Sequence, residues 1–258
     1  MHKFATALLI CALLPAAALA ALAAEGESEA QAGLPGVDWR QWHAANEVAS
    51  LPSLQRGARN FMAYCAGCHS LKYQRYSRMA SDLKITDAQL AAYLIQPGDD
   101  RNQYITGSLA PADGEAWFGK APPDLSLIAR AKGPDYVYRF LKTFYSDPKA
   151  ATGVNNLALP ATAMPHVLSE LQGVQNALFK NGDKKGEVEF TGFEVAVPGR
   201  LSAADYDAFV RDTVNFLAYV GEPSQIYRQN IGVWVILFLL AFTAIAYKLK
   251  QEFWKDVK

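Results

Sequence analysis

The chain has 258 residues, half of them apolar, and its equal numbers of acidic and basic residues give a formal net charge of zero. A neutral chain lacks the basic surplus that binds phosphate backbones, so we expect no nucleic-acid partner. Only three cysteines are present, which excludes a small domain built on a disulfide framework.

Residues 1–24 have the pattern of a secretory signal peptide. A short basic start precedes an apolar run from Phe4 to Leu14 and a stretch of small residues. Cleavage after Ala20, Ala23 or Ala24 would leave small residues at the positions that a signal peptidase inspects. An uncleaved transmembrane helix is the alternative, but the acidic residues that follow favour cleavage.

Residues 25–227 are expected to form one exported domain. They contain 23 acidic and 19 basic residues, a mildly acidic balance. The expected helices run from about Leu54 into the cysteine pair, from Thr86 to before Pro97, from Pro134 through Phe144, and from Ser202 to Gly221. Alternating apolar residues between Val188 and Val197 predict a β-hairpin that turns at Thr191-Gly192. The predicted fold is therefore mainly α-helical, with loop and small β-hairpin insertions.

Residues 228–247 are predicted to form a single transmembrane helix. Nineteen consecutive residues between Arg228 and Lys248 carry no charge. As a helix they would span about 28 Å, close to the thickness of the hydrocarbon core. A buried core helix is the alternative, but it would rarely be apolar on every face. The tail, 248–258, is lysine-rich and should stay in the cytoplasm, which places the preceding domain outside.

The motif Cys65-Ala66-Gly67-Cys68-His69 carries the chemistry. Two thiols at this spacing can add to the two vinyl groups of one haem, and the adjacent histidine then becomes an axial ligand of the iron. A structural zinc site would need four ligands, and the chain has no second cysteine pair. A thioredoxin-like redox pair would follow a strand, whereas this motif follows a helical pattern. One covalently attached haem c is therefore expected.

The sixth iron ligand distinguishes an electron carrier from a haem enzyme. A carrier has both axial positions filled, whereas an enzyme or gas sensor leaves one open. Met62 and Met79 lie too close to the motif to reach the other side of the ring. Met164 follows 95 positions after the axial histidine in a proline-stiffened loop, so it is the predicted ligand. His166 and His43 are the competing candidates.

Several further segments, together with the haem motif, resemble the cytochrome c1 family. They are Arg56-Gly57-Ala58, Tyr64 to Tyr73, Trp117 to Ser126, Asp135-Tyr136, Ala163-Met164-Pro165, and Glu222-Pro223 before the C-terminal anchor. The haem motif alone would indicate only some c-type cytochrome. The Pro-Pro-Asp-Leu segment, the late Met-Pro and the terminal anchor are far more specific, and the resemblance covers nearly the whole mature chain.

The resemblance implies how the haem is held. In the family the Pro-Pro segment lines the haem pocket, and Pro122 and Pro123 match it. A tyrosine matched by Tyr136 contacts the haem propionates together with an arginine. Lys132 occupies the position of that arginine here, so the contact falls to Lys132 or to the nearby Arg130.

The resemblance also implies the function. The haem would accept an electron from the Rieske iron–sulfur protein and pass it to a soluble or membrane-bound cytochrome c, within the quinol–cytochrome c reductase of a bacterial inner membrane. Quinol oxidation would occur in the partner cytochrome b. One alternative is a membrane-anchored monohaem cytochrome of another electron-transfer chain, and a second is a haem enzyme or gas sensor with an open axial site.

Overall fold

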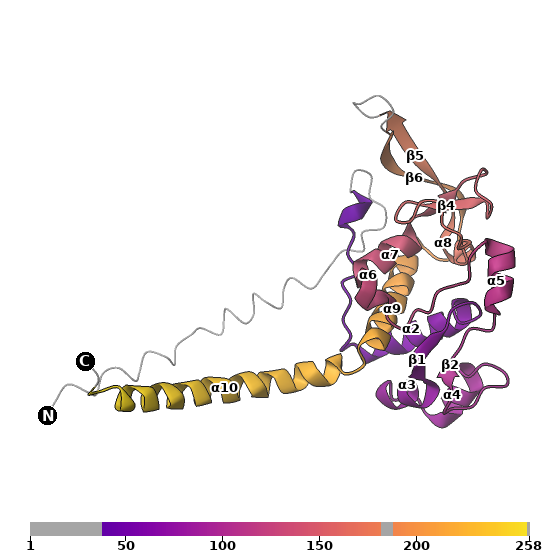
Figure 1. Ribbon diagram of the computed structural model, residues 1–258. Helices are drawn as coiled ribbons and strands as arrows, with labels where there is room; N and C mark the ends of the chain where they lie inside the picture. The colour runs from indigo at the N-terminus through magenta and orange to yellow at the C-terminus, as the bar shows by residue number, and fades with distance from the viewer. Residues whose placement is uncertain (1–37, 182–187, 257–258) are drawn as a thin grey trace.

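The computed structural model describes residues 38–181 and 188–256, so the predicted signal peptide, 1–24, lies outside the described residues. The elements (Figure 1) are η1 (Trp39–Gln41), α2 (Leu51–Tyr64), β1 (Leu71–Arg75), α3 (Tyr76–Asp82), α4 (Asp87–Tyr93), β2 (Tyr104–Ile105), α5 (Pro111–Phe118), α6 (Ile128–Lys132), α7 (Pro134–Lys142), β3 (Phe144–Ser146), β4 (Val154–Asn156), α8 (Ser169–Gln172), β5 (Gly173–Asn181), β6 (Val188–Pro198), α9 (Ala203–Gly221) and α10 (Gln225–Phe253). The strands form three antiparallel pairs, β1–β2, β3–β4 and β5–β6. The mainly helical fold is confirmed.

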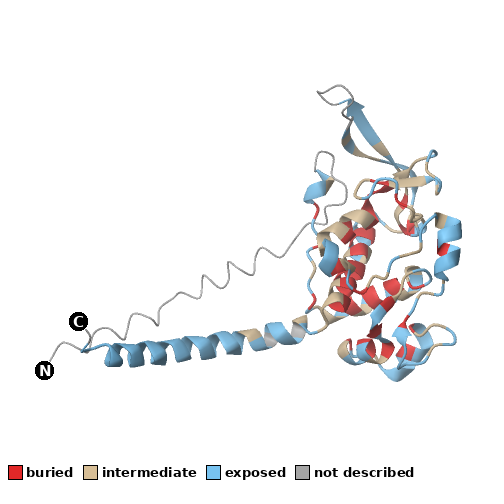
Figure 2. Ribbon diagram, viewed as in Figure 1, coloured by how far each residue is buried: buried red, intermediate tan, exposed pale blue. Residues whose placement is uncertain are grey.

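Helices α2 and α9 pack against each other and form the centre of the domain, where the buried residues gather (Figure 2). The rings of Phe61 and Phe216 meet across the contact with their centroids 5.9 Å apart. Gly57 lets the two backbones approach, because a Cβ at this position would overlap the carbonyl oxygen of Asp212. This crossing holds the end of α2, and with it the haem motif, against the core.

The predicted helix starts at Thr86, Pro134 and Ser202 are confirmed, two of them by side-chain caps and one by a proline in the first turn. Thr86 and Gln89 form a reciprocal capping box at the start of α4. Helix α7 begins at Pro134, and the Ser202 hydroxyl accepts a hydrogen bond from the backbone N–H of Asp205 at the start of α9. These starts could be predicted because each signal lies within one helical turn of the boundary that it sets.

A small β-hairpin is present, formed by β5 and β6, but the prediction that residues 188–197 fold back at Thr191-Gly192 is wrong. Both residues lie inside β6, which pairs with β5 rather than folding back on itself. Gly192 pairs with Leu178 and Phe190 with Phe179, so Thr191 is the extra residue of a β-bulge. The bulge interrupts the alternation of side chains, and we interpreted that interruption as a turn.

Helix α10 extends away from the domain as one continuous helix (Figure 1), and its described side chains are exposed along the apolar stretch (Figure 2). The stretch Tyr227–Phe253 is long and apolar enough to cross a membrane. A predicted C-terminal helix of this kind is therefore confirmed, and it continues past the predicted end at residue 247. Glu222, in the short connection before it, pairs with Arg228 of α10 and with Arg130 of α6.

Candidate haem site

The haem motif forms one tight turn at the end of α2. Cys65 caps the helix, with its N–H donating to the Phe61 carbonyl at 2.8 Å. The backbone N–H groups of Cys68 and His69 both donate to the Cys65 carbonyl, at 3.0 and 2.8 Å. The turn therefore presents two thiols and an imidazole from five consecutive residues, and both cysteines are free thiols.

The Cys65 thiol differs from the activated thiol of a redox pair. Burial raises the pKa of the Cys65 thiol to about 12, and the adjacent Cys68 adds to the shift. Reactive cysteine pairs show the opposite shift, toward the thiolate. Within the described residues no group of three or more potential metal-ligating side chains is found.

The imidazole of His69 is oriented for coordination. Its Nδ1 lies 2.8 Å from the carbonyl oxygen of Pro123. A carbonyl only accepts, so Nδ1 carries the hydrogen and Nε2 keeps a free lone pair. Burial lowers the pKa of His69, although the Pro123 hydrogen bond opposes the shift, and this favours the neutral ring. Metal-ligating histidines commonly have this arrangement, so the site fits an axial haem ligand.

The Pro-Pro segment lies directly against the motif. Besides the Pro123 carbonyl, the N–H of Leu125 donates to the Ser70 carbonyl at 2.9 Å. The carboxylate of Asp124 accepts from the N–H of Lys72 at 2.8 Å and from the N–H of Ser126 at 2.9 Å. The structure thus brings Pro123, and the segment that contains Pro122, to the axial histidine across more than fifty residues of chain.

A second segment, residues 106–109, packs on the other side of the motif. The N–H of Gly107 donates to the Ser70 hydroxyl at 2.8 Å, and the N–H of Leu109 donates to the Gly67 carbonyl at 3.0 Å. A Cβ at Gly107 would lie 2.8 Å from the carbonyl oxygen of Cys68. The absence of a side chain at Gly107 is therefore required for this contact.

Gly107→Ala is expected to destabilise the domain by about 1–3 kcal/mol, because the new methyl group forces the two backbones apart. Chemical denaturation and the yield of haem-loaded protein would measure the loss. Gly192→Ala is the matched control, since a Cβ there meets nothing within 4 Å. Equal stability of the two variants would contradict the prediction.

Met164 lies in the loop between β4 and α8, half-buried and outside regular structure. Met79, by contrast, is fully buried in α3 and belongs to the core.

The two competing histidines have different surroundings. His43 is exposed, and its Nδ1 lies 2.8 Å from a carboxylate oxygen of Asp135. His166 stacks on the ring of Phe144, and burial lowers its pKa to about 4 although Gln172 opposes the shift. Met164 and His166 thus share one loop, and His43 is engaged elsewhere.

A row of aromatic rings joins the predicted propionate contacts to this loop. Tyr136 stacks on Phe140 with centroids 6.4 Å apart, Phe140 meets Phe144 edge-on at 5.1 Å, and Phe144 stacks on His166 at 4.8 Å. Lys132 Nζ lies 5.9 Å from the centre of the Tyr136 ring. The row therefore runs from Tyr136 to His166, which follows Met164 by two positions in the same loop.

The guanidinium of Arg130 has a different partner. Its Nη1 lies 2.7 Å from Glu222 Oε2, which ties α6 to the connection before α10. Of the two basic candidates for the propionates, Lys132 lies beside Tyr136 and Arg130 is paired with Glu222. Sequence reasoning missed this pairing, because the two residues are 92 positions apart and no local pattern links them.

Sequence reasoning also missed the two asparagines that organise the Met164 loop, Asn155 and Asn156. Asn156 accepts hydrogen bonds from two loop N–H groups and donates one to the Phe140 carbonyl of α7, and Asn155 accepts one from the N–H of Ala161. An asparagine in a loop is ordinarily interpreted as a turn residue. No signal in a single sequence distinguishes a buried, fully bonded asparagine from an exposed one.

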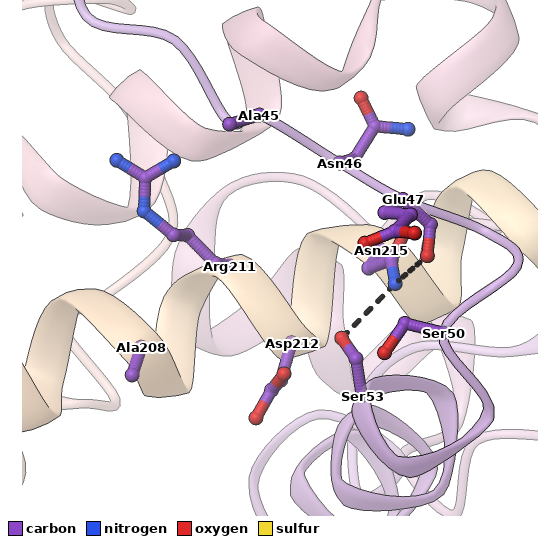
Figure 3. A pocket seen from close by; sticks show the side chains of 9 residues that line it. All are labelled: Ala45, Asn46, Glu47, Ser50, Ser53, Ala208, Arg211, Asp212 and Asn215. Atoms are coloured by element: carbon purple, nitrogen blue, oxygen red, sulfur yellow. Dashed lines mark hydrogen bonds between the residues drawn. The ribbon is translucent and has the colours of Figure 1, made fainter. Parts of the chain in front are cut away.

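A surface pocket lies elsewhere, between the N-terminal segment and helices α2 and α9 (Figure 3). It is lined by Ala45, Asn46, Glu47, Ser50, Ser53, Ala208, Arg211, Asp212 and Asn215. The amide nitrogen of Asn215 donates to the Glu47 carbonyl at 2.7 Å and to the Ser53 hydroxyl at 3.0 Å. None of the predicted haem residues lines this pocket.

The Cytochrome C1 family model matches residues 42–182 and 201–257, more than half of the chain. The chain belongs to the cytochrome c1 family. The cytochrome c1 of Allochromatium vinosum is 47% identical over 80% of this chain and 84% of that relative. The ammonia monooxygenase gamma subunit of Nitrosomonas europaea is 40% identical over 81% of this chain and 85% of that protein. The cytochrome c1 of Rhodospirillum rubrum is 31% identical over 92% of this chain and 94% of that relative.

Membership of the cytochrome c1 family gives the function at a coarse level. The chain is a haem-containing electron-transfer subunit of the cytochrome bc1 complex, anchored to the membrane. The C-terminal helix α10 has the length and composition that such an anchor needs. The observed site agrees with haem binding, because the motif turn and the oriented His69 supply the residues that a c-type haem requires.

Proposed function

We propose that this cytochrome c1 carries an electron from the Rieske iron–sulfur protein to a cytochrome c. One haem would serve this transfer, attached covalently through Cys65 and Cys68 and ligated by His69 and Met164. The observation that supports this most strongly is the His69–Pro123 hydrogen bond, which leaves Nε2 free beside the two thiols. When bound, the haem supplies the one-electron chemistry.

The residues of the chain would set the properties of that haem. Thioethers at the two cysteines would hold it permanently, and His69 would be kept in one tautomer by Pro123. The thioether of Met164 is neutral and favours ferrous iron relative to an imidazole ligand, so the potential should be comparatively high. With both axial positions filled, the site would exchange electrons without binding a substrate.

Lys132 and Tyr136 are proposed to contact the haem propionates. The ammonium group lies over the Tyr136 ring, so both polar groups lie at the same end of the aromatic row. Arg130 is the second candidate that the sequence offers, and its ion pair with Glu222 favours Lys132. Pro122 and Pro123 would form the opposite wall, beside His69.

The covalent link is tested by extraction. Acidified organic solvent should leave the haem with the denatured chain, because thioether bonds at Cys65 and Cys68 do not depend on folding. The absorbance of the precipitated protein measures this directly. Complete extraction of haem into the organic phase would contradict covalent attachment, and with it the proposed function.

The proposed topology places residues 25–227 in the periplasm after removal of residues 1–24, with 228–247 in the inner membrane and 248–258 in the cytoplasm. Truncation after Tyr227 should therefore release a haem-loaded domain into the soluble periplasmic fraction. Fractionation with an alkaline wash measures the outcome. Retention of the truncated chain in washed membranes, also in cells that lack the partner subunits, would contradict this topology.

A second candidate is a related haem subunit that serves another electron-transfer chain. This candidate is supported by the 40% identical relative that is named as an ammonia monooxygenase gamma subunit. Co-purification would separate the two, because only the first candidate travels with cytochrome b and an iron–sulfur protein. A haem enzyme with an open axial site is tested by carbon monoxide, which a Met-ligated carrier should not bind readily.

A further inference from the structure

The loop that carries Met164 lies between β4 and α8 without regular secondary structure. Among the described residues, the backbone N–H of Met164 has one hydrogen-bond partner, the hydroxyl of Thr162 at the long distance of 3.4 Å. A sulfur ligand on such a loop would dissociate readily unless other groups hold the loop in place. The chain must therefore provide that support from residues outside the loop.

Asn156 provides it at the beginning of the loop. Its side chain is completely buried, and its amide nitrogen donates to the Phe140 carbonyl at 2.7 Å. Its amide oxygen accepts from the Thr143 hydroxyl at 3.1 Å and from the backbone N–H groups of Ala158 and Leu159 at 2.8 and 3.1 Å. One side chain thus links the end of α7 to the first residues of the loop through four hydrogen bonds.

The rest of the loop is held by Asn155, which is adjacent to Asn156, and by the stacked ring of His166. The side-chain oxygen of Asn155 accepts from the N–H of Ala161 at 2.8 Å, where the backbone has a φ of 58°. Such a left-handed conformation is strained for alanine and persists only when its surroundings hold it. Beyond Met164, His166 stacks on Phe144. Met164 therefore lies between the Asn155–Ala161 hydrogen bond and His166, and His166 belongs to the aromatic row that begins in α7.

We propose that Asn156 is a positioning residue for the sixth haem ligand: its buried amide holds the loop so that the Met164 sulfur stays on the iron. The inference rests on the proposed assignment of Met164 as that ligand. A buried amide is suited to the task, because each lost hydrogen bond leaves an unpaired group in the interior. The proposal assigns no contact between Asn156 and the haem.

Carbon monoxide is the probe, because it binds only when the sixth position is open. Asn156→Leu removes all four hydrogen bonds at similar volume. In the reduced full-length protein in detergent, we expect the apparent affinity for carbon monoxide to rise about tenfold or more, in proportion to the open fraction. The haem should stay attached. Thr143→Val removes one of the four bonds and should give a smaller rise.

Asn176→Leu is the matched control, since Asn176 is exposed in β5 and its variant should bind carbon monoxide as the wild type does. If Asn156→Leu yields no folded holoprotein, Thr143→Val decides the matter. Unchanged carbon monoxide affinity in every folded variant of Asn156 and Thr143 would overturn the proposal.

A double variant separates this inference from the assignment of the ligand. In a Met164→Leu background, Asn156→Leu should add no further gain in carbon monoxide affinity, because the sixth position is already open. A full additional gain would show that Asn156 acts independently of Met164 and would overturn the proposal. If Met164→Leu alone changes nothing, the ligand assignment fails and this inference fails with it. If Met164→Leu opens the site and Asn156→Leu does not, only the role of Asn156 is refuted.

Discussion

Met164→Leu is expected to abolish quinol-driven reduction of cytochrome c while the haem remains attached to the chain. Leucine has a similar volume and is apolar, so the loss of packing should stay below about 1.5 kcal/mol. Thioether ligation, however, would be lost and the potential should fall. Each 59 mV of lost potential shifts a one-electron equilibrium about tenfold, so the haem would become a poor acceptor for the iron–sulfur protein.

Redox titration and carbon monoxide binding of the reduced protein would measure this result. Met79→Leu is the matched control, because Met79 is fully buried in α3 and should affect only packing. A wild-type spectrum and potential in the Met164 variant would mean that the ligand is another residue. His166, two positions further along the same loop, would then be the next residue to replace.

Asp207→Ala is expected to cost about 3–5 kcal/mol of stability, a large share of the total for a domain. The Asp207 carboxylate is almost fully buried and contacts the ammonium of Lys142, the hydroxyl of Tyr138 and the guanidinium of Arg211. These contacts join α7 to α9. Removal of the carboxylate leaves the ammonium of Lys142 buried without its counter-charge, and this unpaired charge accounts for most of the loss in folding free energy.

The Asp207 carboxyl group also determines how the stability of the fold changes with pH. Burial alone would raise the pKa of Asp207, but Lys142, Tyr138 and Arg211 together outweigh it, and the net pKa lies below the usual value. A carboxyl group with a depressed folded-state pKa stabilises the fold at neutral pH and loses that contribution as the pH falls through the depressed value. The cost of Asp207→Ala should accordingly shrink in acid.

Denaturant unfolding of the detergent-solubilised holoprotein would measure the loss at neutral pH. Glu189→Ala is the control, because its ion pair with Lys180 is about 60% exposed on both sides and should contribute at most about 1 kcal/mol. The double variant Lys142→Met/Asp207→Leu should recover part of the stability, since it removes both buried charges. Equal losses for Asp207→Ala and Glu189→Ala would contradict the prediction.

Features that depend on neighbours along the chain could be predicted from the amino-acid sequence. The haem motif, the capping box at Thr86, the helix starts at Pro134 and Ser202, and the apolar C-terminal helix each depend on residues within a few positions of one another or on one uninterrupted run. Covalent spacing and helical periodicity are local properties, so a single sequence contains them in full.

Only the tertiary structure decided which distant residues meet. It brought the Pro123 carbonyl to His69 and Glu222 to Arg130, and it buried Asp207 beside Lys142, 65 positions away. It also showed that Thr191 is a bulge rather than a turn, and that Asn156 fastens the Met164 loop to α7. These hydrogen bonds and buried contacts form only when α2, α7 and α9 pack together. The pattern of residues within any one segment does not predict that packing.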